Sequence, residues 1–208
     1  MGYNYLKFEK LTKDDFLRNL ATNGFNIGFG AKKNFASYDI INKLPSWVGF
    51  ISLGVGVIQM AYEHMRFNKE LSILMIIVGI AILYADSFKS KLEEYEIEGI
   101  RLTKIFNRLR DMYYIVKADS NFLYNNYEND YQALLNEYYI HTISKQVFMS
   151  QWHAHFKFFY EMQIDWVDEQ LKFKFFKDKF PNSLKAFFLI LAVIFLTIYI
   201  SNGLCSNI

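Results

Sequence analysis

Three apolar stretches without a charged residue constrain this chain more than any other feature of its sequence. They cover residues Ser46–Tyr62, Leu71–Ala85 and Ala186–Gly203. A membrane-spanning helix needs about 20 predominantly apolar residues, with a lower limit near 17. The third stretch meets this length, whereas the first two are short and are separated only by residues 63–70. Because so short a connection suits a tight helical hairpin, we expect a membrane hairpin rather than a hairpin in a soluble core. Local thinning of the bilayer can absorb the missing length.

The composition predicts an all-α integral membrane protein. Hydrophobic residues make up 52% of the chain and charged residues 21%, so the apolar excess is concentrated in the three stretches. Two prolines and ten glycines in 208 residues suit long helices and argue against a turn-rich β fold. A net charge of +2 is too small to indicate nucleic-acid binding, and we expect no nucleic-acid partner. The single cysteine, Cys205, excludes an internal disulfide.

The apolar stretches divide the chain into four parts. We predict a cytoplasmic N-terminal segment over residues 1–44 and a transmembrane hairpin over 45–85. A cytoplasmic helical domain follows over 86–180, and a C-terminal third transmembrane helix with a short tail occupies 181–208. Pro45 and Pro181 precede the first and third spans, at a position that suits the start of a helix.

Lysine and arginine residues near the spans predict the orientation, because these residues are enriched on the cytoplasmic side. Seven precede the first span and thirteen lie in residues 86–180, whereas the hairpin loop carries two. The first 44 residues contain no apolar core of a signal peptide. We therefore expect a multi-pass protein with its N-terminus in the cytoplasm and its C-terminus outside.

The segment between the second and third spans carries a heptad pattern, with apolar residues at alternating steps of four and three and Gly99 in the single gap. We predict one long helix from Leu71 to Lys117 whose seam packs as a coiled coil or oligomer contact. A second helix would follow a cap at Asp119 or Ser120, and a third would cover residues 144–179. The seam residues are Phe88, Leu92, Tyr95, Leu102, Phe106, Leu109, Tyr113 and Val116.

No pattern in the sequence supports catalysis. The glycine-rich tract from Gly24 to Lys33 does not have the spacing of a phosphate-binding loop, and no Ser or Thr follows a Gly-Lys pair. We expect this tract to be a loop or a helix terminus. His153 and His155 are two positions apart on a predicted helix and point in different directions, so a shared metal is not expected. The prediction is therefore a protein that is not an enzyme and that has no cofactor and no metal.

The first span carries a narrow face of small and polar residues at helical spacing. Small residues let helices approach closely, so the simplest interpretation is helix packing. Polar groups in a span seldom face lipid, and the same face could instead line a water-filled path in an oligomer. Both interpretations remain open for these residues, which are Gly49, Ser52, Gly56, Gln59 and Glu63.

Two long tracts of the chain resemble a known family. They are GFNIGFGAKKNFASYDIINKLPSWVGFISLGVGV, from Gly24, and ISKQVFMSQWHAHFKFFYEMQIDWVDEQLKFKFFKDKFP, from Ile143. Together with the short hairpin, they are similar to the SLATT proteins, and the resemblance extends from about Phe16 to Pro181. These proteins are bacterial membrane effectors associated with SMODS nucleotidyltransferases, SLOG nucleotide sensors and, in some branches, reverse transcriptases. The third span departs from a minimal two-span domain.

The resemblance implies a pore-forming effector of an anti-phage or conflict system in the bacterial inner membrane. A nucleotide or stress signal would trigger homo-oligomerisation, the membrane would become permeable, and the infected cell would die or stop growing. A nucleotide-sensing or nucleotide-synthesising protein would be the partner. The alternative function is a non-conducting, membrane-anchored adaptor or sensor whose cytoplasmic bundle docks a partner protein.

Overall fold

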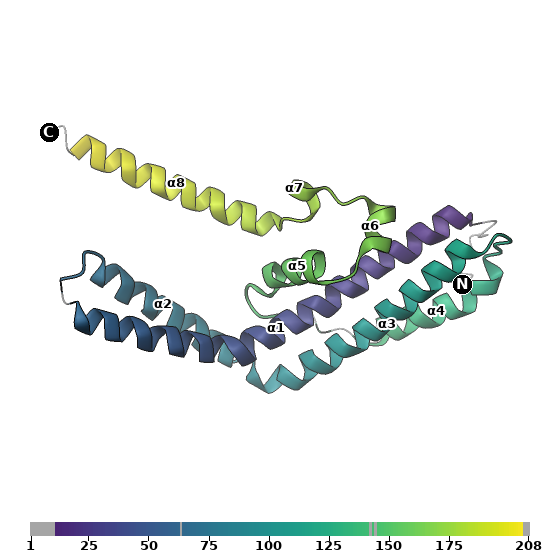
Figure 1. Cartoon of the computed structure of the whole chain (residues 1–208), viewed down its shortest axis with the longest axis horizontal. Helices are drawn as coiled ribbons and strands as arrows, with labels where there is room; N and C mark the ends of the chain where they lie inside the picture. Colours follow the sequence, from purple (N-terminus) through teal and green to yellow (C-terminus); the bar gives the residue numbers. More distant parts are fainter. Residues whose placement is uncertain (1–10, 63, 142, 144, 206–208) are drawn as a thin grey trace, which may run out of the picture. The chain divides into compact units, whose positions relative to one another are not determined.

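The computed structural model describes residues 11–62, 64–141, 143 and 145–205, and this part of the chain is helical without strands (Figure 1). The all-α prediction is therefore confirmed. The chain forms two compact units, one ending at Leu171 and one beginning at Lys172. The helices are α1 (Lys13–Ala61), α2 (Asn68–Asp86), the short 3₁₀ helix η1 (Lys89–Lys91), α3 (Leu92–Ala118), α4 (Asn125–Ile140), α5 (Ser150–Glu161), α6 (Asp165–Leu171), α7 (Phe175–Asp178) and α8 (Asn182–Cys205).

Part of the first unit is a helical bundle, in which the first half of α1 packs along α3. Helices α5 and α6 also contact α1, and α4 contacts α3 (Figure 1). Burying a large apolar side chain contributes about 1.5–3 kcal/mol, so the contact between α1 and α3 is the main source of stability. Fully buried or nearly buried side chains of the two helices include Phe16, Leu20, Ile27, Ala31, Leu102, Ile105, Phe106, Leu109, Tyr113 and Val116.

Polar groups fix the ends of these two helices. The Thr12 side chain caps α1 by accepting a hydrogen bond of 3.2 Å from the Asp15 N–H, an interaction worth about 1 kcal/mol. Lys13 donates hydrogen bonds to the carbonyl oxygens of Lys117 and Asp119, at 2.8 and 2.7 Å. These carbonyls lie at the C-terminal end of α3, where backbone acceptors lack partners within the helix and a cation is favourable. The start of α1 is thereby held to the end of α3.

The glycine-rich tract lies inside α1, so the prediction of a loop or helix terminus is wrong. A Cβ atom on Gly24 would lie 2.2 Å from Cη2 of Trp166, and one on Gly28 would lie 2.8 Å from Cδ2 of Phe106. The absence of side chains at these two positions admits the aromatic rings of α6 and α3. The tract serves close packing, and its glycines do not form a turn.

Helix α1 continues through Pro45 as a single helix of 49 residues, so the prediction that Pro45 lies at the start of a helix is wrong. Proline removes one backbone hydrogen bond and bends a helix, and Figure 1 shows α1 changing direction between the bundle and the hairpin. Residues 13–44 and 92–118 belong to one bundle, and the first span continues directly from it.

The prediction of a single helix from Leu71 to Lys117 is also wrong, because the helix is interrupted between α2 and α3. The Ser87 hydroxyl donates to the Tyr84 carbonyl at 2.7 Å, and such side-chain bonds compete with the helical backbone pattern. Next to this break, Phe88 is buried in a cluster with Ile41 and Ala85. The break therefore lies beside the part of α1 just before Pro45.

Two further helix predictions in the bundle fail for local reasons. Asp119 and Ser120 do not cap the start of the next helix, because α4 begins only at Asn125; Asp119 instead ends α3 and accepts hydrogen bonds from the Asn121 N–H and the Tyr127 hydroxyl. The helix predicted over residues 144–179 is divided into α5, α6 and α7. The divisions let Trp166 of α6 turn inward to Gly24, which a straight helix would not position.

The second unit contains α7 and α8. The Phe175 and Phe180 rings lie 5.8 Å apart edge to face within it. Pro181 immediately precedes α8, as predicted, and its carbonyl accepts hydrogen bonds from the Leu184 and Lys185 N–H groups, both at 3.1 Å. The apolar C-terminal stretch is thus helical, and a membrane-spanning role for it stays a prediction.

Candidate membrane hairpin and its boundary with the bundle

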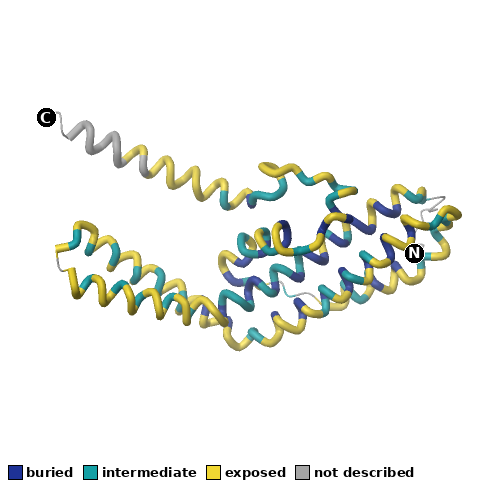
Figure 2. The backbone as a smooth tube through the Cα atoms, in the orientation of Figure 1, coloured by how far each residue is buried: buried dark blue, intermediate teal, exposed yellow. Residues whose placement is uncertain are grey.

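The second half of α1 and the whole of α2 form a hairpin with almost no buried residues. Within the described part of the chain, α1 and α2 are long and apolar enough to cross a membrane, and α8 carries a further apolar segment over residues 182–194. No residue in the apolar segment of α1 is buried, and only 6% of the apolar segment of α2 is buried. Figure 2 shows the contrast with the bundle, where dark blue buried positions follow α1 and α3. A hairpin in a soluble core would be covered, so these surfaces suit lipid.

Inside the hairpin, the polar face predicted on the first span divides into two parts. Ser52 and Gln59 are half-buried and lie toward α2. The Gln59 amide donates hydrogen bonds to the Asn68 carbonyl and the Ser72 hydroxyl of α2, both at 3.0 Å. Ser72 in turn donates to the Asn68 carbonyl. These bonds join the two helices of one chain near the hairpin tip. The sequence singled out Gln59 and missed Asn68 and Ser72, although both lie at helical spacing at the start of the second apolar helix.

The two glycines of the same face lie on its exposed side. A Cβ atom on Gly49 or Gly56 would meet no atom within 4 Å. Neither glycine is therefore needed for packing within one chain. Glu63, the fifth residue of the predicted face, lies outside the described residues.

The predicted heptad seam lies inside the bundle of a single chain. Gly99, the gap in the pattern, receives the Phe35 ring of α1, whose Cε1 would lie 2.9 Å from a Cβ at this position. The seam thus packs on α1, and a contact between copies of the chain must use other surfaces. Of the seam residues, Tyr95, Leu102, Phe106, Leu109, Tyr113 and Val116 are buried together with Phe88, and Leu92 is half-buried.

A buried ion pair that the sequence did not indicate lies on the same helix. Glu98 is only 3% exposed, and Arg101 donates hydrogen bonds to both of its carboxylate oxygens, at 2.7 and 2.8 Å. His141 Nδ1 lies 3.2 Å from Glu98 Oε2. Hydrogen bonding to Glu98 raises the pKa of Arg101 against the opposing effect of burial. The spacing of Glu98 between Tyr95 and Leu102 was the available signal, since it places the carboxylate on the buried face.

Charged side chains gather where the hairpin meets the bundle. Asp39 pairs with Lys43 at 2.7 Å and also accepts a hydrogen bond from Lys157 of α5. Burial alone would raise the pKa of Asp39, but the hydrogen bonds from both lysines outweigh it and lower this pKa. Burial, followed by the charge of Lys157, lowers the pKa of His153, which is half-buried.

The second histidine of α5 packs against aromatic rings. His155 lies 4.9 Å from the Phe29 ring, edge to face, and 5.6 Å from that of Phe159. In the described residues, no three His, Cys, Asp or Glu side chains gather as metal ligands would. The chemistry at this boundary is consequently that of ion pairs beside an apolar surface.

The comparison with known families agrees with the hairpin geometry. Residues 11–188 match the model of SLATT_6, the SMODS and SLOG-associating 2TM effector domain 6. The chain belongs to this family. The SLATT_6 domain is a two-transmembrane effector domain, and its two spans correspond to the two apolar helices of the hairpin. SLATT_6 is a membrane effector family and not a known enzyme family. No curated protein and no solved structure matches the chain significantly.

Proposed function

We propose that the protein is a pore-forming effector of a bacterial conflict system. Several copies would assemble in the inner membrane on a nucleotide or stress signal and make it permeable, so that an infected cell dies or stops growing. The observation that supports this function best is the uncovered hairpin in a chain whose family is named for its two-span effector domain. Among the described residues of the first unit, the apolar segments of α1 and α2 are almost entirely unburied, so lipid and neighbouring copies are available to cover them.

The exposed glycines suggest how copies would meet. Gly49 and Gly56 are separated by two helical turns and leave open space on the outer side of α1. Small residues allow close approach of helices in lipid, where packing rather than the hydrophobic effect drives association. In this proposal the glycine side contacts the next hairpin. The cluster of Gln59, Asn68 and Ser72 supplies polar groups to the water path near the hairpin tip.

Ion flux through liposomes tests the pore. Gly56→Leu adds bulk at the contact between copies, and Gln59→Leu removes the polar side chain of the tip cluster; both should suppress leakage and the toxicity of overproduction. Leucine is favoured in a span, so neither change should impair insertion. Ile51→Leu and Ile58→Leu, which are conservative changes at exposed positions of the same helix, are the controls and should leak as the wild type does.

Failure of flux would favour the adaptor function. Phe156 and Tyr160 stack with ring centroids 5.4 Å apart on the exposed side of α5, a surface suited to a protein partner. If the assembled wild-type protein passes no ions in the presence of its trigger, the pore function is wrong. The protein would then act as a membrane-anchored adaptor that docks its partner through the bundle.

The proposed topology has its own test. The basic residues around the spans favour a topology with the N-terminus and the bundle in the cytoplasm and, with α8 as a third span, the C-terminus outside. Alkaline phosphatase fused after Ile208 should be active, and a fusion after Ser120 should be inactive. The reverse pattern would contradict the three-span topology.

A further inference from the structure

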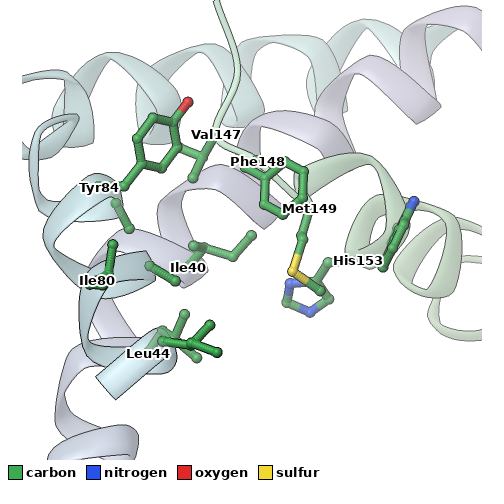
Figure 3. A pocket seen from close by; sticks show the side chains of 12 residues that line it. Ile40, Leu44, Ile80, Tyr84, Val147, Phe148, Met149 and His153 are labelled. Atoms are coloured by element: carbon green, nitrogen blue, oxygen red, sulfur yellow. The ribbon is translucent and has the colours of Figure 1, made fainter. Parts of the chain in front are cut away.

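An apolar well lies at the base of the hairpin, where both spans meet the start of α5. Its volume is about 640 Å³, within the range of small-molecule sites. Figure 3 shows Ile40 and Leu44 of α1, Ile80 and Tyr84 of α2, and Phe148 and Met149 around it. Nearly all of the surface of the well is carbon, since the lining is aliphatic and aromatic apart from a few polar atoms.

A polar groove adjoins the well and shares Ile40, Leu44 and His153 with it. The groove adds the charged pair of Asp39 and Lys157 described above. Its remaining lining residues are Lys43, Trp47 and Glu161. An apolar well beside a groove of mixed charge matches an amphipathic ligand with a charged head and an apolar tail.

We propose that the well and groove bind one membrane glycerophospholipid, with an acyl chain in the well and the phosphate at Lys43. This inference rests on the proposed insertion of the hairpin into the membrane. The well continues into the uncovered surface of the spans, because Ile77 and Ile80 of its lining are among the exposed residues of α2. Lipid hydrocarbon next to the spans therefore reaches the well without crossing water.

The charges of the groove fit the head of such a lipid. Lys43 keeps a 62% exposed side chain while it contacts Asp39, and can turn its ammonium group to a phosphate. Trp47 beside it is 65% exposed, and tryptophan is enriched at the interface between membrane and water. The groove thus combines a basic side chain with a tryptophan suited to the interface, and the adjoining well is apolar enough for an acyl chain.

The backbone at the rim of the well supports a built site. Met149 precedes α5 with φ of 66°, in the left-handed region that costs a non-glycine residue about 1–2 kcal/mol. Strained residues of this kind cluster at ligand sites and switch regions. Here the strain holds Met149 against the well (Figure 3).

Tryptophan quenching by phospholipids brominated on their acyl chains tests the inference in nanodiscs. Trp152 lines the well, Trp47 lies on the exposed span, and Trp166 is 1% exposed in the core of the bundle. The Trp47→Phe variant reports Trp152 and the Trp152→Phe variant reports Trp47, each over the background of Trp166. The Trp47→Phe/Trp152→Phe double variant should show almost no quenching, and subtracting it isolates each signal.

We expect brominated lipid to quench both Trp47 and Trp152. Quenching of Trp47 without Trp152 would overturn the lipid site and leave the hairpin in the membrane, with the well covered by a protein segment. Absence of Trp47 quenching would instead overturn the insertion of the hairpin, and with it the proposed function.

A variant that fills the well separates a bound lipid from one that only passes nearby. Ala81→Phe places a ring in the well and should remove most of the Trp152 quenching without changing that of Trp47. Leu83→Phe, on an exposed position of the same helix that does not line the well, is the matched control and should change neither. Unchanged Trp152 quenching in Ala81→Phe would contradict an acyl chain in the well.

The headgroup contact is tested by counting phospholipids retained by the detergent-purified protein with native mass spectrometry. Lys43→Glu should lose the retained lipid, whereas Lys104→Glu, on an exposed position of α3, should keep it. Equal retention in the two variants would overturn the phosphate contact at Lys43.

Discussion

The two halves of α1 use the same small residue in opposite ways. In the bundle half, aromatic rings occupy the space beside two glycines: Trp166 lies against Gly24 and Phe106 against Gly28. In the hairpin half, Gly49 and Gly56 border open space, as does the intervening residue Gly54. In one continuous helix, the glycines of the bundle half (the closed half) pack against aromatic rings, and the glycines of the hairpin half have no neighbouring side chain.

The difference shows that glycine spacing alone does not define a contact. The bundle half has its partners within the chain, on α3, α5 and α6. Among the described residues of the first unit, the hairpin half contacts α2 on one side, and its other side is left for lipid or for another copy. Substitutions in the bundle half should therefore change the free energy of unfolding of one chain, whereas those in the hairpin half should change assembly and leave folding intact.

The strongest test of the closed half is a charge in its core. Leu109 is fully buried between α3 and α1, and Leu109→Asp would leave a carboxylate without a partner. An uncompensated buried charge costs about 3–5 kcal/mol. Because a whole domain is stable by only about 5–15 kcal/mol, we expect the bundle to unfold or to melt at a far lower temperature. Circular dichroism of the detergent-solubilised protein measures this change.

Ile115→Asp is the matched control for that experiment. Ile115 belongs to the same helix but is 59% exposed, so the same new charge meets water and should change the melting temperature little. Equal melting of the two variants would contradict the buried face assigned to α3.

The intermediate effect comes from the glycines themselves. Gly24→Ala forces Cβ against the buried Trp166 ring, and overpacking of this kind costs about 1–3 kcal/mol. Gly56→Ala meets no atom, and alanine favours a helix by about 1 kcal/mol over glycine, so bundle stability should not fall. Gly30→Ala is a control within the bundle half, since its Cβ would lie at an ordinary 3.4 Å from Leu102. Thermal unfolding of the three variants should rank Gly24→Ala lowest; a Gly24→Ala variant as stable as the other two would remove the contrast between the halves.

Much of this architecture could be predicted from the sequence because apolar periodicity reports burial directly. The two hairpin helices follow from uncharged apolar stretches, and the buried face of α3 follows from the heptad positions from Tyr95 to Val116. The pattern does not say what a buried face packs against. The seam was predicted to pack as a coiled coil or an oligomer contact, and in the single chain it packs against the first half of α1, which is distant in sequence.

The errors at helix ends have more than one physical cause. The Ser87 hydroxyl competes with the helical backbone pattern where the long predicted helix is interrupted, whereas α1 continues past Pro45 although proline removes a backbone hydrogen bond. The glycine-rich tract was predicted to be a loop or a helix terminus, but Gly24 and Gly28 lie within a helix and allow aromatic rings of distant helices to pack closely against it. The well and the groove at the hairpin base combine residues from α1, α2 and α5, so no local pattern could reveal them.

The smallest expected effect concerns the point where the two halves of α1 meet. Asp39 lies near the end of the closed half; its ion pair with Lys157 connects α1 to α5, and its second pair, with Lys43, lies within α1. Burial opposes ionisation of Asp39, but the lysine hydrogen bonds prevail and lower its pKa below the ordinary 3.8. The folded state thus binds this proton less readily than the unfolded state does.

The sign of the pH dependence follows from that shift. A lowered folded-state pKa stabilises the protein above the unfolded-state pKa near 4, and the contribution is lost as the pH falls through the folded-state value. Partly exposed ion pairs contribute up to about 1 kcal/mol, so the effect is small. Wild-type protein should melt above Asp39→Asn at pH about 6, and the gap should narrow toward pH about 3, because only the wild-type residue gains a proton. The other carboxylates titrate in both proteins, so their contributions cancel in the difference between the two melting temperatures. A gap that stays constant with pH would show that the charge of Asp39 does not hold α5 against the end of the closed half, and that apolar packing alone fixes where the hairpin begins.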